Sequence, residues 1–321
     1  MILPQVDSLD DYRQIYRNKA VWLPAMRAIC ERHGLNVAWL EFAPPGSHVV
    51  FRVRPDLYIK LFAPFWHRDF VPERLVLGRL SRQSDWPVPR LAAEGEIEGW
   101  PYLIVTAVGG VPLGEVWDSM GKANQEQIAR RCGEFMAWLH STPTDGLDAI
   151  AVDWPAFVER QVQACASKLA QSDLDERLAR STLEFLDRLP LLFEPDVQPV
   201  LLSADVTDEH VLVGKRGGRW ELTGYIDFGD AMLGPPYYDF VAPGCSITHA
   251  SPRLRRAMLL GYGFSEGQLD ERLSERLMAY TLVHRFIDVP YLLTLFGSQQ
   301  LASLYDLSRA LWSFSDEYLT S

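Results

Sequence analysis

The chain has 321 residues, of which 48% are hydrophobic and 23% are charged, and its formal net charge at pH 7 is −11. This composition is typical of a globular protein and excludes collagen-like, low-complexity and largely disordered classes. The length predicts about two structural units. The excess of negative charge disfavours binding to nucleic acid or to anionic lipid, and it favours the capture of a cationic small molecule.

The cysteines and the apolar stretches indicate the cellular compartment of the protein and whether the chain crosses a membrane. The cysteines are far apart and form no CxxC pair and no group at zinc spacing. The N-terminal segment has neither the basic start nor the apolar core of a signal peptide. The longest uncharged stretch, 289–305, is too short and too polar for a membrane-spanning helix. We therefore expect a cytoplasmic protein that binds neither nucleic acid nor membrane.

The first part of the chain predicts helices followed by a small sheet. Residues 8–33 carry apolar side chains at three- and four-residue spacings, which indicates one amphipathic helix or a helix pair ending at Gly34. The period then changes, because three short runs rich in β-branched and aromatic residues follow, separated by the turn sequences PPGS and RPD. These runs, at 37–42, 48–53 and 57–62, predict three antiparallel strands.

A helix around 72–81 and two further strands, 90–96 and 102–107, complete this part of the chain. Beyond Gly109 and Gly110 the pattern is helical, and the first helix there carries apolar residues at helical intervals between 128 and 139. Further helices are expected at about 155–189, 252–262, 267–293 and 298–318, and short strands at 200–202, 211–213 and 222–226.

These patterns divide the chain into three parts. Residues 1–105 form a strand-rich N-terminal lobe, 106–110 a hinge, and 111–321 a mainly helical C-terminal lobe. No internal repeat is present. We expect the few short strands of the C-terminal lobe to hold loops, and these loops contain the residues that could take part in catalysis.

Two aspartates stand on the expected loops of the C-terminal lobe. Asp205 lies in LLSADVTDEHVLV, 201–213, and Asp227 lies 22 residues later in YIDFGDAMLGPPYYDF, 225–240. A loop aspartate, a short apolar strand, a turn and then Ile-Asp-Phe-Gly are typical of phosphoryl-transfer enzymes of the protein-kinase type. The two segments resemble the aminoglycoside phosphotransferase family, whose pattern reads H-G-D-x-x-x-x-N-V-L-V, then I-D-F/W, then G and Y-D.

The N-terminal lobe carries the same resemblance independently. GSHVVFRV, 46–53, is similar to the reduced glycine loop of that family. Lys60 lies in the third expected strand, and Glu73 follows 13 residues later on the next helix, as a lysine–glutamate ion pair requires. GEFMAWLH, 133–140, is similar to the apolar helix of the family that ends in Leu-His. Together the matches cover about 45–240.

The resemblance implies a fold and an activity. The fold would be α+β and two-lobed like a protein kinase, with a small antiparallel-sheet N-lobe, a mainly helical C-lobe and the nucleotide in the cleft. The activity would be transfer of phosphate from ATP or GTP to a hydroxyl of a small molecule, with Mg²⁺ or Mn²⁺ as cofactor. For an aminoglycoside acceptor this activity would mean antibiotic resistance.

The resemblance also implies a role for each matched residue. Lys60 would hold the α- and β-phosphates, Glu73 would orient Lys60, Asp227 would bind the metal ion, and Asp205 would accept or orient the proton of the acceptor hydroxyl. Backbone N–H groups of Gly46, Ser47 and His48 would cover the phosphates. The nucleotide base would contact backbone groups of Thr106, Ala107 and Val108 and the apolar side chains of Leu212 and Ile226.

The chain departs from the family pattern in the catalytic loop. Ser203 and Ala204 replace the His-Gly pair, and His210 stands where the family has its metal-binding asparagine. Imidazole suits Mg²⁺ less well than oxygen does. Three alternatives remain open: the second metal position is lost, His210 acts through hydrogen bonding, or Asp208 or Glu209 supplies the oxygen. Direct ligation of the metal ion by the His210 imidazole is also open, and it would favour Mn²⁺ over Mg²⁺.

The acceptor is expected to be cationic. Acidic residues near the presumed acceptor side would suit an aminoglycoside-like amino sugar; they are Asp208, Glu209, Asp230 and Asp239. Asp239 also fits a second interpretation, in which it braces the loop. Kinases of choline-like alcohols or sugars are alternatives, and so is a catalytically weakened nucleotide-binding regulatory protein, because Ser203, Ala204 and His210 depart from the pattern.

Overall fold

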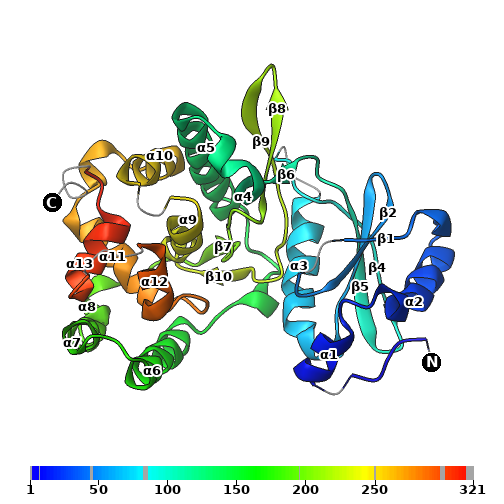
Figure 1. Ribbon diagram of the computed structural model, residues 1–321, viewed down its shortest axis with the longest axis horizontal. Coiled ribbons are helices and arrows are strands. Elements are labelled where there is room, and N and C mark those ends of the chain that lie inside the picture. The colour runs from blue at the N-terminus through cyan, green and yellow to red at the C-terminus, as the bar shows by residue number, and fades with distance from the viewer. Residues whose placement is uncertain are drawn as a thin grey trace. The chain divides into compact units, whose positions relative to one another are not determined.

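The computed structural model describes residues 2–6, 8–43, 46–81, 86–194, 196–248, 251–296 and 301–315. Two compact units are present (Figure 1). The sheet unit comprises Met1–Gly110 with Thr223–Asp230, and the helical unit comprises Val111–Leu222 with Ala231–Ser321. The short segment Thr223–Asp230 thus belongs with the sheet, although its sequence neighbours belong with the helices.

In the described part of the chain, five antiparallel strands build the sheet, in the order β1-β2-β3-β5-β4. Their bounds are β1 Glu41–Phe42, β2 Val49–Arg54, β3 Leu57–Leu61, β4 Leu91–Ile97 and β5 Trp100–Thr106. The strand expected at 37–42 is mostly wrong. Val37–Trp39 forms a 3₁₀ helix instead, because the Asn36 side chain accepts a hydrogen bond from Ala38 N–H at 2.9 Å and caps the turn.

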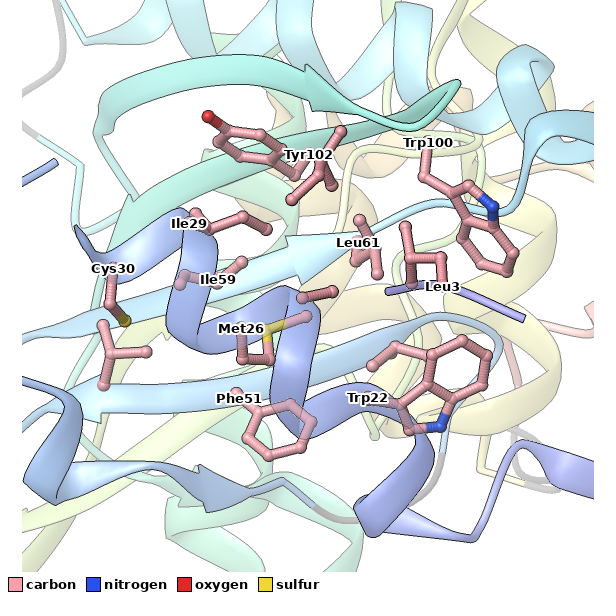
Figure 2. Close-up of a cluster of buried hydrophobic side chains, with 14 of the residues drawn as sticks. Leu3, Trp22, Met26, Ile29, Cys30, Phe51, Ile59, Leu61, Trp100 and Tyr102 are labelled. Carbon is pink, nitrogen blue, oxygen red and sulfur yellow. The ribbon is translucent and has the colours of Figure 1, made fainter. Parts of the chain in front are cut away.

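One face of the sheet packs against helix α2 (Lys19–Arg32), which follows the short helix α1 (Leu9–Ile15). Alternate residues of β2 and β3 are buried and face α2, as a strand period of two requires. Figure 2 shows Trp22, Met26 and Ile29 of α2 over Phe51, Ile59 and Leu61 of the strands. Each such side chain contributes about 1.5–3 kcal/mol when fully buried. This apolar layer is the core that makes the sheet rigid.

The opposite face of the sheet carries helix α3 (His67–Leu80) (Figure 1). This helix begins five residues before the expected start at Pro72, so Pro72 lies inside the helix and does not mark its first residue. Lys60 lies between Ile59 and Leu61 on β3 and therefore points away from α2, toward α3. The strand pleat thus brings one lysine to the helix that holds Glu73.

Helices dominate the helical unit. The long helix α5 (Lys122–His140) packs closely against α10 (Pro252–Tyr262). α5 begins at Lys122 directly after its N-cap, Gly121. The other helices are α4 Leu113–Val116, α6 Trp154–Gln171, α7 Glu176–Leu186, α8 Leu189–Leu192, α9 Val241–Ser246, α11 Glu271–Leu282, α12 Val289–Leu295 and α13 Leu304–Trp312.

The helix expected at 298–318 is shorter in the structure, where α13 covers Leu304–Trp312. The rest of that expectation falls partly on 298–300 and 316–318, which lie outside the described residues. Within the described ranges, no helix combines the length and the apolar character that crossing a membrane requires.

Short strands hold two loops. β7 (Val200–Leu202) pairs with β10 (Met232–Gly234), and β8 (Val211–Arg216) lies between β6 (Val111–Pro112) and β9 (Arg219–Tyr225). The three short strands of the helical part that the sequence predicts are present, whereas β6 and β10 were not expected. The loop 203–210 therefore begins and ends on strands, and so does the loop 226–231.

Candidate active site

Lys60, Glu73 and Asp227 meet within the sheet unit. Lys60 Nζ donates to Glu73 Oε2 at 2.6 Å and to Asp227 Oδ1 at 3.1 Å. The side chains of Lys60 and Glu73 are 9% and 5% exposed, whereas that of Asp227 is 36% exposed. The cluster therefore has a buried end at Glu73 and a solvent-facing end at Asp227.

Charge keeps the cluster together. Burial alone would lower the pKa of Lys60, but the carboxylates of Asp227 and Glu73 outweigh burial and raise the pKa above its usual value. The ammonium group therefore stays charged at neutral pH. A buried, fixed positive charge next to an accessible carboxylate can hold phosphate oxygens and leave an oxygen ligand for a cation.

Backbone conformation sets the direction of Asp227. Its φ is +67°, in the left-handed region where few residues other than glycine are stable, although aspartate tolerates it better than most. The Gly229 N–H donates to Asp227 Oδ1 at 3.1 Å and holds the carboxylate in place. A Cβ at Gly229 would lie 3.2 Å from Asp227 Oδ1 and 3.5 Å from Asp69 Cβ, so little space remains there for a side chain.

The loop before β2, residues 46–48, carries the expected phosphate-binding N–H groups. One of them is already used: the Gly46 N–H donates to Tyr16 Oη at 2.6 Å, so this N–H points into the unit, contrary to the expectation. The His48 side chain is buried against Phe62 and lies with Nε2 3.4 Å from Asp69 Oδ2. Burial lowers the pKa of His48 and favours the neutral ring.

Two of the backbone N–H groups expected to contact the base are already bonded within the sheet unit. The Thr106 N–H donates to the Arg90 carbonyl and the Ala107 N–H donates to the Asp56 carbonyl at 2.8 Å, so neither N–H is available to a base. The reason is that β5 continues its hydrogen bonding through these residues. The Val108 side chain packs against Gly224, Leu212 is buried in β8, and Ile226 is half-buried after β9.

Asp205 is the central residue of the loop in the helical unit. It directly follows Ala204, which has a φ of +61°. The loop is fixed by Asp239, which accepts from Ser203 N–H at 3.0 Å and from Ala204 N–H at 2.5 Å. Such fixed backbone strain is typical of functional loops.

Asp239 is not placed to touch a substrate. Only 1% of the residue is exposed, and besides the two loop N–H groups it pairs with His140 Nε2 at 2.9 Å. The other ring nitrogen, Nδ1, lies 3.0 Å from Tyr262 Oη. Because a carboxylate only accepts, Nε2 carries the proton and Nδ1 accepts from the tyrosine hydroxyl. The substrate-binding interpretation of Asp239 is therefore wrong, and the interpretation as a brace of the loop is supported.

His210 is hydrogen-bonded to Asp205, five positions earlier in the chain. Its Nδ1 lies 2.9 Å from the backbone oxygen of Asp205, 3.2 Å from Asp205 Oδ2 and 3.2 Å from Thr207 Oγ1. A carbonyl oxygen only accepts, so Nδ1 donates to Asp205. This orientation supports the hydrogen-bonding alternative and leaves Nδ1 no part in metal ligation.

The remaining acidic residues have different environments. The Asp208 carbonyl accepts from Gly114 N–H at 3.0 Å, and its carboxylate packs directly against Gly114. Glu209 is exposed, and Asp230 is half-buried. Across the described ranges, no group of three or more His, Cys, Asp or Glu side chains is arranged to hold a metal ion.

Sequence reasoning missed one buried residue behind the loop. His284 is 3% exposed, stacks on Tyr238 with 4.6 Å between ring centroids, and faces the backbone of Ala204. Burial, helped by Arg285, lowers the pKa of His284 to about 3 against the opposing effect of the Ala204 carbonyl. No motif marks it, because it comes 79 positions after Asp205 in the sequence.

Comparisons with known proteins bear on the fold of the chain. The chain resembles the GDP complex of wild-type aminoglycoside 2′-phosphotransferase-IIIa, with 18% identity, a TM-score of 0.66, and coverage of 90% of this chain and 95% of that one. It also resembles the streptomycin–ATP–APH(2″)-IIa ternary complex, with 16% identity, a TM-score of 0.58, and coverage of 86% and 96%. Aminoglycoside phosphotransferase APH(3″)-Id from Streptomyces rimosus gives 20% identity, a TM-score of 0.55, and coverage of 81% and 98%.

These likenesses confirm the two-lobed, kinase-like α+β fold. No curated protein matches the chain by sequence. Residues 39–275 match the sequence profile of the phosphotransferase enzyme family. The match covers well over half of the chain, and the chain belongs to the phosphotransferase enzyme family.

Proposed function

We propose that the protein transfers the γ-phosphate of ATP or GTP to a hydroxyl group of a small molecule. The observation that carries the proposal is the cluster of Lys60, Glu73 and Asp227, with Nζ–oxygen distances of 2.6 and 3.1 Å. A buried ammonium held by one carboxylate and facing a second, exposed one is suited to phosphates with a divalent cation. An ion pair that only stabilised the sheet would not need the accessible carboxylate.

The cluster fits a magnesium ion in its donor chemistry. Asp227 presents a hard oxygen donor and is partly exposed, and a nucleotide-bound Mg²⁺ needs only one or two protein carboxylates besides phosphate oxygens. When bound, the ion would neutralise charge on the β- and γ-phosphates. Lys60 would hold the phosphates, and Glu73 would keep Lys60 in its rotamer.

Asp205 would accept the proton of the acceptor hydroxyl group. In the proposed step the acceptor oxygen forms a bond to the γ-phosphorus, the bond from phosphorus to the β–γ bridging oxygen breaks, and the acceptor proton passes to Asp205. The nucleoside diphosphate leaves. His210 would orient the Asp205 carboxylate through the Nδ1 hydrogen bonds of 2.9 and 3.2 Å.

An aminoglycoside-like amino sugar is the acceptor that we favour. The net charge of −11 and the exposed Glu209 suit a polycation. Structures similar to this chain include complexes of related enzymes with streptomycin, gentamicin and kanamycin. A choline-like alcohol or a sugar would be phosphorylated by the same residues, so the acceptor is the part of the proposal that a screen must decide.

An acceptor screen with ATP and GTP tests the proposal. Nucleoside diphosphate release and phosphorylated product would be measured for aminoglycosides, choline-like alcohols and neutral sugars. Substitution Asp205→Asn should lower kcat by about 100-fold or more and leave nucleotide affinity nearly unchanged. The exposed Asp173 of the same unit offers a control, and Asp173→Asn should behave like the wild type. Wild-type turnover in Asp205→Asn would refute the assignment.

Two further variants separate the roles in the sheet unit. Asp227→Asn should weaken the binding of Mg²⁺–nucleotide more than that of metal-free nucleotide, whereas Lys60→Met should reduce both binding and turnover. If the wild type binds nucleotide but transfers phosphate to no acceptor under any metal, the protein is a nucleotide-binding regulatory protein instead of a kinase.

A further inference from the structure

Tyr12 of α1 and Tyr16, which caps the C-terminal end of that helix, hold the loop that precedes β2. Tyr12 Oη donates to the Ser47 carbonyl at 3.1 Å, and Tyr16 Oη donates to the His48 carbonyl at 3.1 Å. Tyr16 Oη also accepts from the Gly46 N–H at 2.6 Å. The two tyrosines are four positions apart and therefore share one face of the helix. Three backbone groups of one short loop are thus bonded to a single helical face.

These bonds determine where the remaining N–H groups of the loop point. In a trans peptide the carbonyl of one residue and the N–H of the next point in opposite directions. Because the Ser47 carbonyl points toward α1, the His48 N–H points away from α1. The loop therefore presents a backbone donor on the side opposite to the helix, and backbone donors of this kind bind phosphate oxygens.

The tyrosine rings cannot move easily. Tyr12 and Tyr16 are 2% and 8% exposed. Tyr12 packs at ring-centroid distances of 4.9 Å from Trp66, 5.9 Å from Trp22 and 6.5 Å from Trp100. Trp22 and Trp100 belong to the core layer drawn in Figure 2. The loop is therefore tied through the two hydroxyl groups to the rigid core of the sheet unit.

The hydroxyl groups remain donors at all ordinary pH values. Burial raises the pKa of Tyr12 and, against the opposing effect of the Gly46 N–H, that of Tyr16 above the usual value for a phenol. The hydroxyl hydrogen bonds of both tyrosines go to the loop backbone, and the charge of Lys60 acts on Tyr16 only by lowering its pKa slightly against the effect of burial. Their effect on a nucleotide would therefore be exerted mainly through the loop.

We propose that Tyr12 and Tyr16 are positioning residues for the nucleotide phosphates, acting through the backbone of residues 46–48. The proposal rests on the nucleotide-binding function proposed above. It predicts that α1, which lies outside the part of the chain that matches the family profile, contributes to nucleotide affinity.

Substitution Tyr16→Phe removes one hydroxyl and keeps the ring. It should weaken the binding of Mg²⁺–ATP or Mg²⁺–GTP by about 10-fold, because two backbone groups lose a hydrogen-bond partner and the loop loosens. Adenosine and guanosine have no phosphates, so competition by these nucleosides should be unchanged. A general loss of structure would weaken the binding of nucleotides and nucleosides alike.

Tyr102→Phe is a matched control in the same unit. Tyr102 is fully buried, and its hydroxyl pairs with His33 Nε2 at 2.9 Å and accepts from Arg32, away from the loop. We expect a similar decrease in melting temperature but unchanged nucleotide affinity. Tyr12→Phe, which removes only the bond to Ser47, should weaken Mg²⁺–nucleotide binding about 3-fold. It keeps the test informative if Tyr16→Phe does not fold.

The outcomes are distinct. Weaker phosphate-dependent binding in the α1 variants with an unaffected Tyr102→Phe supports the proposal. Wild-type affinity for Mg²⁺–nucleotide in both folded α1 variants overturns it and leaves the proposed function intact. Equal losses for nucleotide and nucleoside also overturn it, because the effect would then be general. If the wild type binds no nucleotide, the proposed function itself fails and the positioning role fails with it.

Discussion

His210 occupies the position where the family pattern has asparagine, and it is bonded to the aspartate that would accept the proton. The distances of 2.9 Å to the Asp205 carbonyl and 3.2 Å to Oδ2 give the imidazole two acceptors on one residue. A side chain that fixes the backbone and the carboxylate of the same residue limits its rotamers. At the residue scale, these bonds support the proposal that His210 orients Asp205 instead of supplying a ligand to a metal ion.

This interpretation predicts the result of His210→Asn. If the imidazole orients Asp205, kcat should fall by about 10-fold with both Mg²⁺ and Mn²⁺, and the ratio between the two metals should not change. Steady-state kinetics with each metal measure this directly. His67→Asn, at an exposed position, is the control. A clear shift of preference toward Mg²⁺ with full activity would instead mean that His210 is a metal ligand.

His284 predicts a pH dependence of stability. Its pKa in the folded protein, about 3, lies below the usual 6.5, so the unfolded chain binds a proton that the folded chain does not when the pH falls below 6.5. The stabilising effect of neutral His284 is therefore complete above pH 6.5 and is lost progressively as the pH falls toward 3. The expected slope is about 1 kcal/mol for each pH unit.

Urea unfolding at pH 7 and pH 5.5 checks this expectation. The free energy of unfolding should decrease over this interval by about 1 kcal/mol less in His284→Gln than in the wild type. His67→Gln, an exposed histidine with no such burial, should decrease like the wild type. Identical pH profiles for His284→Gln and the wild type would contradict the buried neutral state.

Single residues differ in how far the sequence predicts them. The spacing of Lys60 and Glu73 predicts their ion pair, because a strand followed by a helix brings the two positions together. The buried position of Asp239 is not predictable in this way, since it depends on His140 at the end of α5. The use of the Gly46 N–H by Tyr16 is also invisible, because it requires α1 to dock beside β2.

At the scale of elements, the contact between α5 and α10 depends on two glycines. A Cβ at Gly133 would overlap the Met258 carbonyl oxygen, and a Cβ at Gly261 would overlap the Arg130 carbonyl oxygen. The two helix backbones thus approach closely at both positions. Since α5 also ends at His140, which bonds Asp239, the packing of these helices reaches the loop of Asp205.

Gly133→Ala should therefore be strongly destabilising. Overpacking typically costs about 1–3 kcal/mol, and here the added methyl group would overlap backbone atoms that cannot rotate aside, so we expect a cost near the upper end of this range, against a gain of about 1 kcal/mol from replacing glycine in a helix. Gly78 of α3 is the matched control, because a Cβ there meets no atom within 4 Å. Gly78→Ala should be neutral or stabilising by up to about 1 kcal/mol. Chemical unfolding of both variants measures the contrast, and equal effects would contradict it.

Periodic elements are the ones that the sequence predicts well. α2 and α5 have apolar stripes long enough to be recognised, and β2 and β3 alternate clearly. β6 and β10 contain two and three residues, too few for any period to be visible. Their existence depends on partners elsewhere in the chain, such as β7 for β10. Sequence reasoning therefore finds the framework and misses the small strands that complete the loops.

At the scale of the whole molecule, chain order and spatial grouping differ in one segment. Thr223–Asp230 comes between residues of the helical unit but groups with the sheet unit, and it carries Asp227 to Lys60. Composition gives no sign of this, because residues 223–230 resemble other strand-and-turn sequences. The family pattern anticipates the result only through the order Lys60, Glu73, Asp205, Asp227.

The net charge of −11 gives a prediction for the whole protein. If the acceptor is an aminoglycoside-like polycation, long-range attraction should raise its rate of capture, and salt should screen that attraction. The screening length decreases from about 30 Å at 0.01 M to about 8 Å at 0.15 M.

We therefore expect kcat/KM for a polycationic acceptor to fall by about 10-fold over this range of salt concentration while kcat changes little, because screening acts on encounter and not on the chemical step. A neutral sugar assayed at the same nucleotide concentration is the internal control, since any effect of salt on nucleotide binding or on the fold would appear with both acceptors. A flat profile for the preferred acceptor would favour a neutral alcohol and would remove the electrostatic argument for an amino sugar. The roles proposed for Lys60, Asp227 and Asp205 do not depend on this result, because their own variants test them.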